Sequence, residues 1–210
     1  MTRLIFATHN SGKLTEMKSL LSDLPIEILS ADEAGVHEDP IEDGVTFEEN
    51  ALKKARFVAE KTGQWAVADD SGICIDALGG RPGVFTARWA GENAGDEGLV
   101  RHTLAQLKEI PEGARGASFH SVAALVSPAG EERTFDGVVA GQVVMTPRGS
   151  ARPKLPYDVL FVPTGFDRTF AEMSDEQKNA LSHRGVAFQK LKVFLSSGWL
   201  GTKETDPSSV

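Results

Sequence analysis

A polar loop near the start of the chain contains residue types that could bind an anion. Thr8-His9-Asn10-Ser11-Gly12-Lys13 joins a short apolar segment to a helical pattern, so backbone amides and a lysine ammonium would lie at a helix start. The loop differs from a Walker phosphate loop at two positions, because Ala7 replaces its first glycine and Leu14 replaces the magnesium-binding Ser or Thr. Taken alone, it favours an ordinary polar turn over a phosphate site.

Carboxylates form a second group of candidate residues. Asp69, Asp70 and Ser71 follow the apolar segment 65–68, so we expect two carboxylates and a hydroxyl at the end of a buried strand. Glu42 belongs to an acidic run at 38–43 that by itself favours a solvated loop. Oxygen-rich groups of this kind suit Mg²⁺, whereas the single cysteine and the scattered histidines do not have the spacing of zinc ligands.

Basic side chains form a third group. Lys178, His183 and Arg184 lie close together in the sequence and could bind a substrate phosphate or a base carbonyl. They are equally typical of a helix C-terminus, where cations are favourable and Gly185 would end the helix. Lys54 lies at the flank of the apolar face of another predicted helix. Residue types alone leave a Ser-His-Asp triad open, but the chain has no Gly-x-Ser-x-Gly elbow.

The hydrophobic pattern predicts the elements that would position these groups. Short apolar runs predict strands at 4–7, 65–68, 118–127, 133–145 and 157–162, with a hairpin turn at 128–130. Helical periodicity predicts helices at 11–21, 46–63, 96–107 and 186–195, and capping boxes begin at Thr46 and Ser174. This order of strands and helices predicts a single α/β domain with a mixed sheet.

Length and composition limit the class of protein. The 210 residues fit one compact unit, and those after Gly201 are typical of a frayed tail. The formal net charge of −8 disfavours a broad surface for nucleic acid or an anionic membrane. The sequence has no apolar run of membrane length and no apparent secretory signal, and its lone Cys74 cannot form an internal disulfide. We therefore expect a cytoplasmic protein.

Five ordered motifs resemble those of the inosine triphosphate pyrophosphatases, also called the Ham1-like family, and the resemblance runs from about residue 4 to residue 195. The motifs are Ala7-Thr8-His9-Asn10-Ser11-Gly12-Lys13, Thr46-Phe47-Glu48-Glu49-Asn50-Ala51 with Lys54-Ala55, Ala68-Asp69-Asp70-Ser71-Gly72, Leu78-Gly79-Gly80-Arg81-Pro82-Gly83, and Ser182-His183-Arg184-Gly185. Together they are far more specific than any one of them alone.

The resemblance implies an elongated α/β fold with a mixed sheet, flanking helices and two lobes around a central cleft, formed by one domain over residues 1–200 with a tail at 201–210. It also implies a homodimer and the Mg²⁺-dependent hydrolysis of ITP, dITP and XTP to the monophosphate and pyrophosphate. A nucleoside triphosphate would then be the partner molecule, with no role for nucleic acid or a membrane.

The resemblance also implies a role for each matching residue. Asp70 would be the general base, and Glu42 with Asp70 would hold the metal. Ser71 would touch the substrate. The residues that would bind the triphosphate are Thr8, His9, Asn10, Ser11, Gly12, Lys13 and Lys54. The residues that would read the 6-oxo edge of the purine are Lys178, His183 and Arg184.

One segment departs from the family pattern. Where the family usually has Gly-x-Gly-Phe-Gly-Tyr-Asp-Pro, this chain has Arg152-Pro153-Lys154-Leu155-Pro156-Tyr157-Asp158-Val159. The expected base contacts are Leu155, Pro156, Tyr157 and Asp158. Leu155 replaces the aromatic residue that would stack on the base. Stacking is worth roughly 1–3 kcal/mol per base, so base affinity or selectivity could be lower here unless Phe161 or Trp89 takes that position.

Two alternatives stay open at this point. The chain could be a pyrophosphatase with a different nucleotide preference, such as the related Maf-type enzymes. It could also be a nucleotide-binding module without catalytic activity. The joint presence of Lys13, Lys54, Asp69 and Asp70 favours an enzyme.

Overall fold

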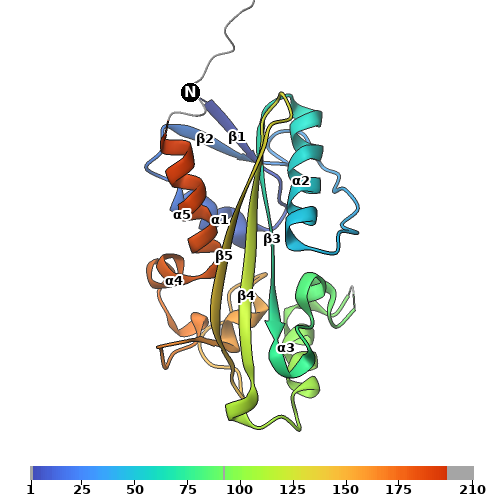
Figure 1. The fold of residues 1–210 in the computed structure, drawn as a ribbon, viewed down its shortest axis with the longest axis vertical. Coiled ribbons are helices and arrows are strands. Elements are labelled where there is room, and N and C mark those ends of the chain that lie inside the picture. Colours follow the sequence, from blue (N-terminus) through green and yellow to red (C-terminus); the bar gives the residue numbers. More distant parts are fainter. Residues whose placement is uncertain (1, 92, 198–210) are drawn as a thin grey trace, which may run out of the picture.

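The centre of the computed structural model, which describes residues 2–91 and 93–197, is a six-stranded sheet (Figure 1). The strands are β1 Thr2–Phe6, β2 Ile26–Ser30, β3 Trp65–Ile75, β4 Gly116–Val126, β5 Glu132–Val143 and β6 Phe161–Pro163. Their spatial order is β2-β1-β3-β4-β5-β6. β1 is parallel to β2 and to β3, and the other neighbours are antiparallel, so the sheet is mixed as predicted.

Helices cover both faces of the sheet. The α-helices are α1 Ser11–Leu20, α2 Phe47–Thr62, α3 Gly95–Gln106, α4 Asp175–Leu181 and α5 His183–Ser196, and short 3₁₀ helices span Asp76–Leu78, Gly83–Arg88, Glu112–Ala114, Pro156–Val159 and Phe170–Glu172. α2 lies on one side of β1 and β3, and α1 and α5 lie on the other (Figure 1). Because β3, β4 and β5 run along the longest axis, the molecule is elongated.

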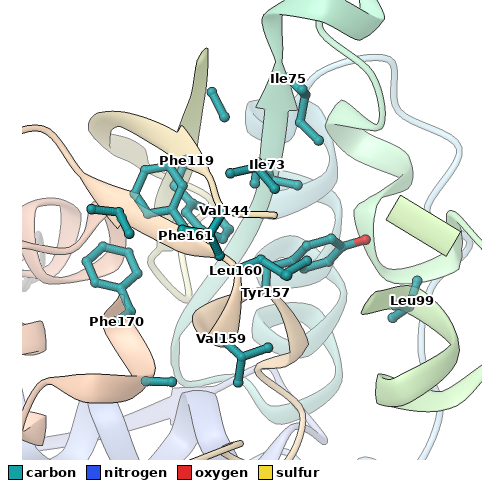
Figure 2. Close-up of a cluster of buried hydrophobic side chains, with 14 of the residues drawn as sticks. Ile73, Ile75, Leu99, Phe119, Val144, Tyr157, Val159, Leu160, Phe161 and Phe170 are labelled. Atoms are coloured by element: carbon teal, nitrogen blue, oxygen red, sulfur yellow. The ribbon is translucent and has the colours of Figure 1, made fainter. Parts of the chain in front are cut away.

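The core consists of three groups of side chains. Small residues of α2 pack on the alanines of β3 on one face, and Met17 and Phe188 of α1 and α5 pack on Phe6 on the other. A third, aromatic group lies around Phe119 and Phe161 at the other end of the long strands (Figure 2). Large aromatic side chains therefore fill the core at this end of the molecule. On the α2 face, small alanine side chains let the helix pack close to the sheet.

Most predicted elements are confirmed, including the hairpin and both helix starts. At Ser174 the capping box is complete: its hydroxyl accepts from the amide of Gln177, and its own amide donates to the Gln177 side chain. At Thr46 the hydroxyl accepts from the Glu49 amide as predicted, but the Glu49 carboxylate accepts from the amide of Val45 instead. The strand β2 was not predicted.

Three predicted boundaries were wrong. The strand predicted at 65–68 continues through both aspartates to Ile75, because β4 pairs with it along its whole length. The segment 157–162 is mainly a 3₁₀ turn over Pro156–Val159, and only Phe161–Pro163 pairs with β5. Gly185 does not end a helix, since α5 already begins at His183.

Two further predictions concern the ends and the environment of the chain. The tail predicted at 201–210 lies outside the described residues. Over the residues that are described, no helix combines the length and apolar character needed to cross a membrane.

Candidate active site

A pocket of about 430 Å³ lies beside β3, just beyond the point where β1 ends. β1 pairs with β3 only at Trp65, Ala66 and Val67, whereas β3 continues to Ile75. Side chains from both faces of β3 can therefore reach one space next to its uncovered edge. Successive residues of a strand point to opposite faces, so Asp69 and Asp70 contact different helices.

On the α2 face, Lys54 joins two carboxylates. Its Nζ lies 3.2 Å from Asp70 Oδ1 and 3.3 Å from Glu42 Oε2, and all three residues line the pocket. Asn50, fully buried on α2, donates its side-chain amide to Asp70 Oδ2 at 3.3 Å. Its carbonyl accepts from the Gly44 amide and so ties the loop that carries Glu42 to the helix.

The pKa values on this face follow from burial. Burial raises the pKa of Asp70, and the nearby Lys54 ammonium only partly opposes this. For Lys54 burial acts to lower the pKa, but the charges of Asp70 and Glu42 outweigh it and raise the value. Lys54 therefore stays charged, and the Asp70 carboxylate beside it is more basic than an exposed carboxylate.

On the opposite face, Asp69 is enclosed by cations. Its Oδ2 lies 3.0 Å from Lys13 Nζ and 3.1 Å from Arg184 Nε, and its side chain is 0% exposed. Burial by itself would raise the pKa of Asp69, but the Lys13 and Arg184 charges hold it well below its usual range. Arg184 also donates to the Ser71 hydroxyl at 2.9 Å. Asp69 is a fixed anion that positions the two cations.

Glu16 of α1 extends this network to the other basic residues. It accepts from Lys178 Nζ at 2.6 Å and from Arg184 Nη1, and Lys178 also contacts Asp158 at 2.7 Å. Burial would raise the pKa of Glu16, but Arg184 and Lys178 outweigh it and lower the value. The network thus fixes Lys178 and Arg184 side by side in the pocket lining.

His183 lies beside this pair as a neutral ring. It stacks on Phe119 with 4.4 Å between ring centroids and 7° between planes. Burial, together with the Arg184 and Lys178 charges, holds the pKa of His183 well below its ordinary value. Its buried Nδ1 has no hydrogen-bond partner among the described residues. A neutral imidazole in the pocket lining can both donate and accept a hydrogen bond.

Close backbone contacts place His183 and Arg184. Ser182 caps α5 by accepting from the Gly185 amide, and a Cβ at Gly185 would overlap the Asn179 carbonyl. A Cβ at Gly137 of β5 would overlap the His183 carbonyl. The glycines therefore allow the start of α5 to lie directly on the sheet and α4.

The loop after β1 has a different role for each of its residues. Asn10 caps α1 by accepting from the Gly12 and Lys13 amides at 2.9 and 3.2 Å, so these amides are already bonded. Thr8 accepts from the Asn10 amide at 3.1 Å. Of the six predicted residues, Thr8, His9, Asn10 and Lys13 line the pocket, whereas Ser11 and Gly12 do not.

His9 connects the loop to the acidic segments behind it. Its Nδ1 is 3.0 Å from Asp32 and its Nε2 is 3.4 Å from Asp39. The hydrogen bond with Asp32 raises the pKa of His9 despite partial burial. The imidazole thus links the loop after β1 to the segment that leads to Glu42.

The segment 154–158 forms another wall of the pocket. Leu155, Pro156, Tyr157 and Asp158, for which base contacts are predicted, all line it, and the Tyr157 hydroxyl donates to the Thr86 carbonyl at 3.0 Å. Neither Phe161 nor Trp89 belongs to the pocket lining. The lining includes the aromatic rings of Tyr157 and of Phe119, and His183 already covers one face of Phe119.

The charges of the site suit an added cation. The two networks combine five basic side chains, Lys13, Lys54, Arg152, Lys178 and Arg184, with six carboxylates, Glu16, Glu42, Asp69, Asp70, Asp158 and Asp175. No cluster of three metal-ligating side chains occurs within the described residues. Glu42 and Asp70 nevertheless offer two pocket-facing carboxylates, and Mg²⁺ commonly takes one or two carboxylates and fills its shell with water and substrate phosphates. The residues present therefore fit a magnesium ion held jointly with a polyphosphate.

Three residues of the site were not predicted. Asn50 is in a quoted motif but was given no role, although an amide four residues before Lys54 lies on the same helix face. Glu16 could have been noticed as an acid one turn after Lys13, on the same side of α1 as the apolar stripe. Phe119 shows no signal in the sequence that separates it from other core residues.

Comparison with known proteins places this site in a family. The family model described as "Ham1 family" matches residues 4–194. A Streptomyces avermitilis protein named dITP/XTP pyrophosphatase is 49% identical over 193 residues, covering 91% of this chain and 96% of that protein. A Bacillus subtilis protein of the same name is 41% identical over 197 residues, covering 94% and 98%. The structure of a HAM1 protein from Coxiella burnetii superimposes with a TM-score of 0.85 at 41% identity, covering 94% of this chain and 100% of that one. The chain belongs to the Ham1 family.

Proposed function

We propose that this protein hydrolyses the non-standard purine nucleotides ITP, dITP and XTP to the monophosphate and pyrophosphate. The observation that carries the proposal is that one pocket is lined both by Lys13, Lys54 and the Glu42 and Asp70 carboxylates and by Lys178, His183 and Arg184. The relatives named dITP/XTP pyrophosphatase, which align over most of the chain, support the same activity.

Asp70 acts as the general base. It orients a water molecule and takes its proton as the water oxygen attacks the α-phosphorus, and the bond from that phosphorus to the bridging oxygen breaks to release pyrophosphate. A carboxyl whose pKa is raised by burial is a stronger base than an exposed one, which suits Asp70. Lys13 and Lys54, with Thr8 and Asn10, bind the triphosphate and stabilise the charge that develops on it. Ser11 and Gly12 act on the loop conformation.

Glu42 and Asp70 would hold the magnesium ion. When bound, Mg²⁺ neutralises phosphate charge and polarises the phosphoryl group for attack. Lys54 contacts the same two carboxylates, at 3.3 Å from Glu42 and 3.2 Å from Asp70. Asn50 holds Asp70 through its second oxygen, so the carboxylate stays aimed into the pocket.

Lys178, His183 and Arg184 select the base. A 6-oxo group accepts hydrogen bonds, whereas the 6-amino group of adenine donates them, so the donor-only side chains of Lys178 and Arg184 would leave donors facing donors with ATP. The neutral His183 ring can take either role. Glu16, Asp69 and Asp158 hold the cations in place, and Ser71 positions Arg184 beside the substrate. Leu155, Pro156 and Tyr157 supply a largely apolar wall for the base.

The sequence resemblance supports three further parts of the proposal. Two lobes enclose the pocket as a cleft, residues 1–200 form one domain, and two copies form a homodimer. We also retain the cytoplasm as the expected location, where the nucleotide pool is found.

Pyrophosphate release from ITP, XTP, GTP, ATP, dUTP and CTP, measured with and without Mg²⁺, tests the proposal. We expect rapid Mg²⁺-dependent turnover of ITP and XTP and little turnover of ATP. A preference for dUTP or CTP would indicate a pyrophosphatase of the alternative type. Binding of nucleotides without turnover would identify a non-catalytic module.

A further inference from the structure

Lys154 differs from Arg184 and from the other lysines of the pocket in its charge environment. Arg88 also lines the pocket without an ion pair among the described residues, but its guanidinium donates to the Glu42 backbone carbonyl at 3.2 Å. Lys13, Lys54, Lys178 and Arg184 each contact at least one carboxylate within 4 Å. For the exposed Lys154, which also lines the pocket, no ion pair occurs anywhere in residues 2–91 and 93–197. Its charge is therefore available to an anionic ligand.

The backbone of Lys154 is held in an unusual conformation. Its φ of 64° makes it the non-glycine residue with positive φ in the described part of the chain. A side chain is disfavoured there, and glycine would adopt the same conformation freely. The Lys154 amide donates to Asp96 Oδ2 at 2.8 Å, so the carboxylate at the start of α3 holds the backbone and not the ammonium. A lysine is thus fixed at the pocket where glycine would be the less strained residue.

Contacts with the loop after β1 place the backbone of Lys154 beside the segment that leads to Lys13. Its carbonyl lies 3.5 Å from the Asn10 side-chain nitrogen, which donates to it. The preceding carbonyl, of Pro153, would lie 3.1 Å from a Cβ on Gly12. The segment 153–154 therefore packs against the same loop that leads to Lys13. By contrast, Arg152 is turned inward and contacts Asp158 and Asp175.

We infer that the Lys154 ammonium binds the phosphate chain of the nucleotide, as a contact supplied by the segment that packs against the loop leading to Lys13. The inference rests on the proposed function, because that function supplies a triphosphate as the ligand. An unpaired cation adds positive charge to a site whose two networks contain more carboxylates than basic groups. It therefore favours a polyanion without removing any existing ion pair.

The test uses the full chain and the variants Lys154→Gln, Lys154→Arg and Lys154→Gly. Calorimetric titration with inorganic tripolyphosphate in the presence of Mg²⁺ measures the phosphate contact without any base. We expect Lys154→Gln to weaken this binding about fivefold, and Lys154→Arg to retain it, since a partly exposed ion pair has that order of strength. Lys108→Gln, which removes an exposed cation outside the pocket lining, is the matched control and should bind like the wild type.

The glycine variant separates charge from backbone effects. Lys154→Gly removes the ammonium and permits the same φ, so we expect weaker tripolyphosphate binding with an unfolding midpoint at least as high as that of the wild type. Weakening in Lys154→Gly and Lys154→Gln alike supports the phosphate contact. Unchanged tripolyphosphate binding in Lys154→Gln overturns the phosphate contact. A variant that loses inosine binding but keeps tripolyphosphate binding also overturns it, because inosine carries no phosphate.

Failure of this inference can be told from failure of the proposed function. If the wild type hydrolyses ITP and XTP but Lys154→Gln has unchanged KM and unchanged tripolyphosphate binding, the function stands and the Lys154 contact is wrong. If tripolyphosphate binding depends on Lys154 but ITP and XTP are not hydrolysed, the contact stands and the proposed activity is wrong.

Discussion

Asp69 and Asp70 are neighbours on β3, but the two faces of the sheet give their carboxyl groups opposite properties. Asp69 lies between Lys13 and Arg184 with its side chain fully buried, and its pKa is far below the usual range. The Asp70 side chain is 12% exposed, lines the pocket and has a raised pKa, although Lys54 is 3.2 Å away. The number and proximity of cations on each face explain the difference.

Asp69 is therefore suited to a structural role, whereas Asp70 is suited to proton transfer. A carboxylate that two buried cations enclose gains little by accepting a proton, so it is suited to hold those cations in place. A carboxyl with a raised pKa and access to a pocket can accept a proton from bound water. We therefore expect substitution of Asp70 to change mainly turnover, and substitution of Asp69 to change mainly stability.

The largest effect is expected for Asp70→Asn. Removing the proposed general base should lower kcat for ITP about 10³-fold. The free energy of unfolding should be unchanged or higher, because burial disfavours the charged form of Asp70 and the amide carries no charge. Steady-state pyrophosphate release and urea unfolding measure the two quantities. Full activity in this variant would show that another group is the base.

Asp69→Asn, in contrast to Asp70→Asn, should lower the free energy of unfolding. It leaves Lys13 and Arg184 as buried cations without this shared carboxylate, and breaking such a buried pair should cost about 3 kcal/mol of unfolding free energy. Urea unfolding at neutral pH checks this, with Asp70→Asn as the matched variant. Equal stability of the two variants would contradict the distinction between the faces.

His183 adds a pH dependence to the α1–α5 face. Because its pKa in the folded protein is well below 6.5, the unfolded chain binds an extra proton as the pH falls below about 6.5, and unfolding becomes easier. Relative to His183→Gln, the wild type should lose about 1.4 kcal/mol of unfolding free energy between pH 7.5 and pH 5.5. Urea unfolding at both pH values gives the difference. Parallel pH profiles of the two proteins would show that His183 titrates normally in the fold.

The smallest effect is expected on the uncharged wall of the pocket. Leu155→Phe supplies an aromatic ring that could stack on the base, and the low end of stacking energies corresponds to a KM for ITP about fivefold lower. Kinetics with ITP and with inorganic tripolyphosphate as a competitive inhibitor separate base from phosphate effects. A lower inhibition constant for tripolyphosphate would mean that the substitution acts on the phosphate end instead.

Local patterns were sufficient to predict much of the secondary structure. The capping signals at Thr46 and Ser174 and the apolar periodicity of α2 act within a few residues, so the sequence alone places these helices. The extent of β3 could not be predicted in this way, because polar residues such as Asp69 remain in a strand only when a partner strand supplies the hydrogen bonds. The sequence predicts that β3 ends beside the aspartates, but the strand that ends there is β1.

The candidate site was predicted unevenly for the same reason. Lys13, Lys54, Asp70 and Arg184 were identified by type and order, whereas Glu16, Asn50 and Phe119 act through contacts with residues remote in the chain. The amides at positions 12 and 13 were expected to face a ligand, but Asn10 already accepts from both. Side chains compete for backbone donors, and only the folded geometry decides which one is bonded.

The sequence by itself determined the local elements and the inventory of charged groups, because helix caps, apolar periodicity and residue types depend on near neighbours. The tertiary structure decided which charges meet, since the early end of β1 exposes both faces of β3 to one pocket. It also decided that Asp69 and Asp70 have opposite pKa shifts. A pKa depends on burial and on charges within a few ångströms, and residues from four separate segments supply them here.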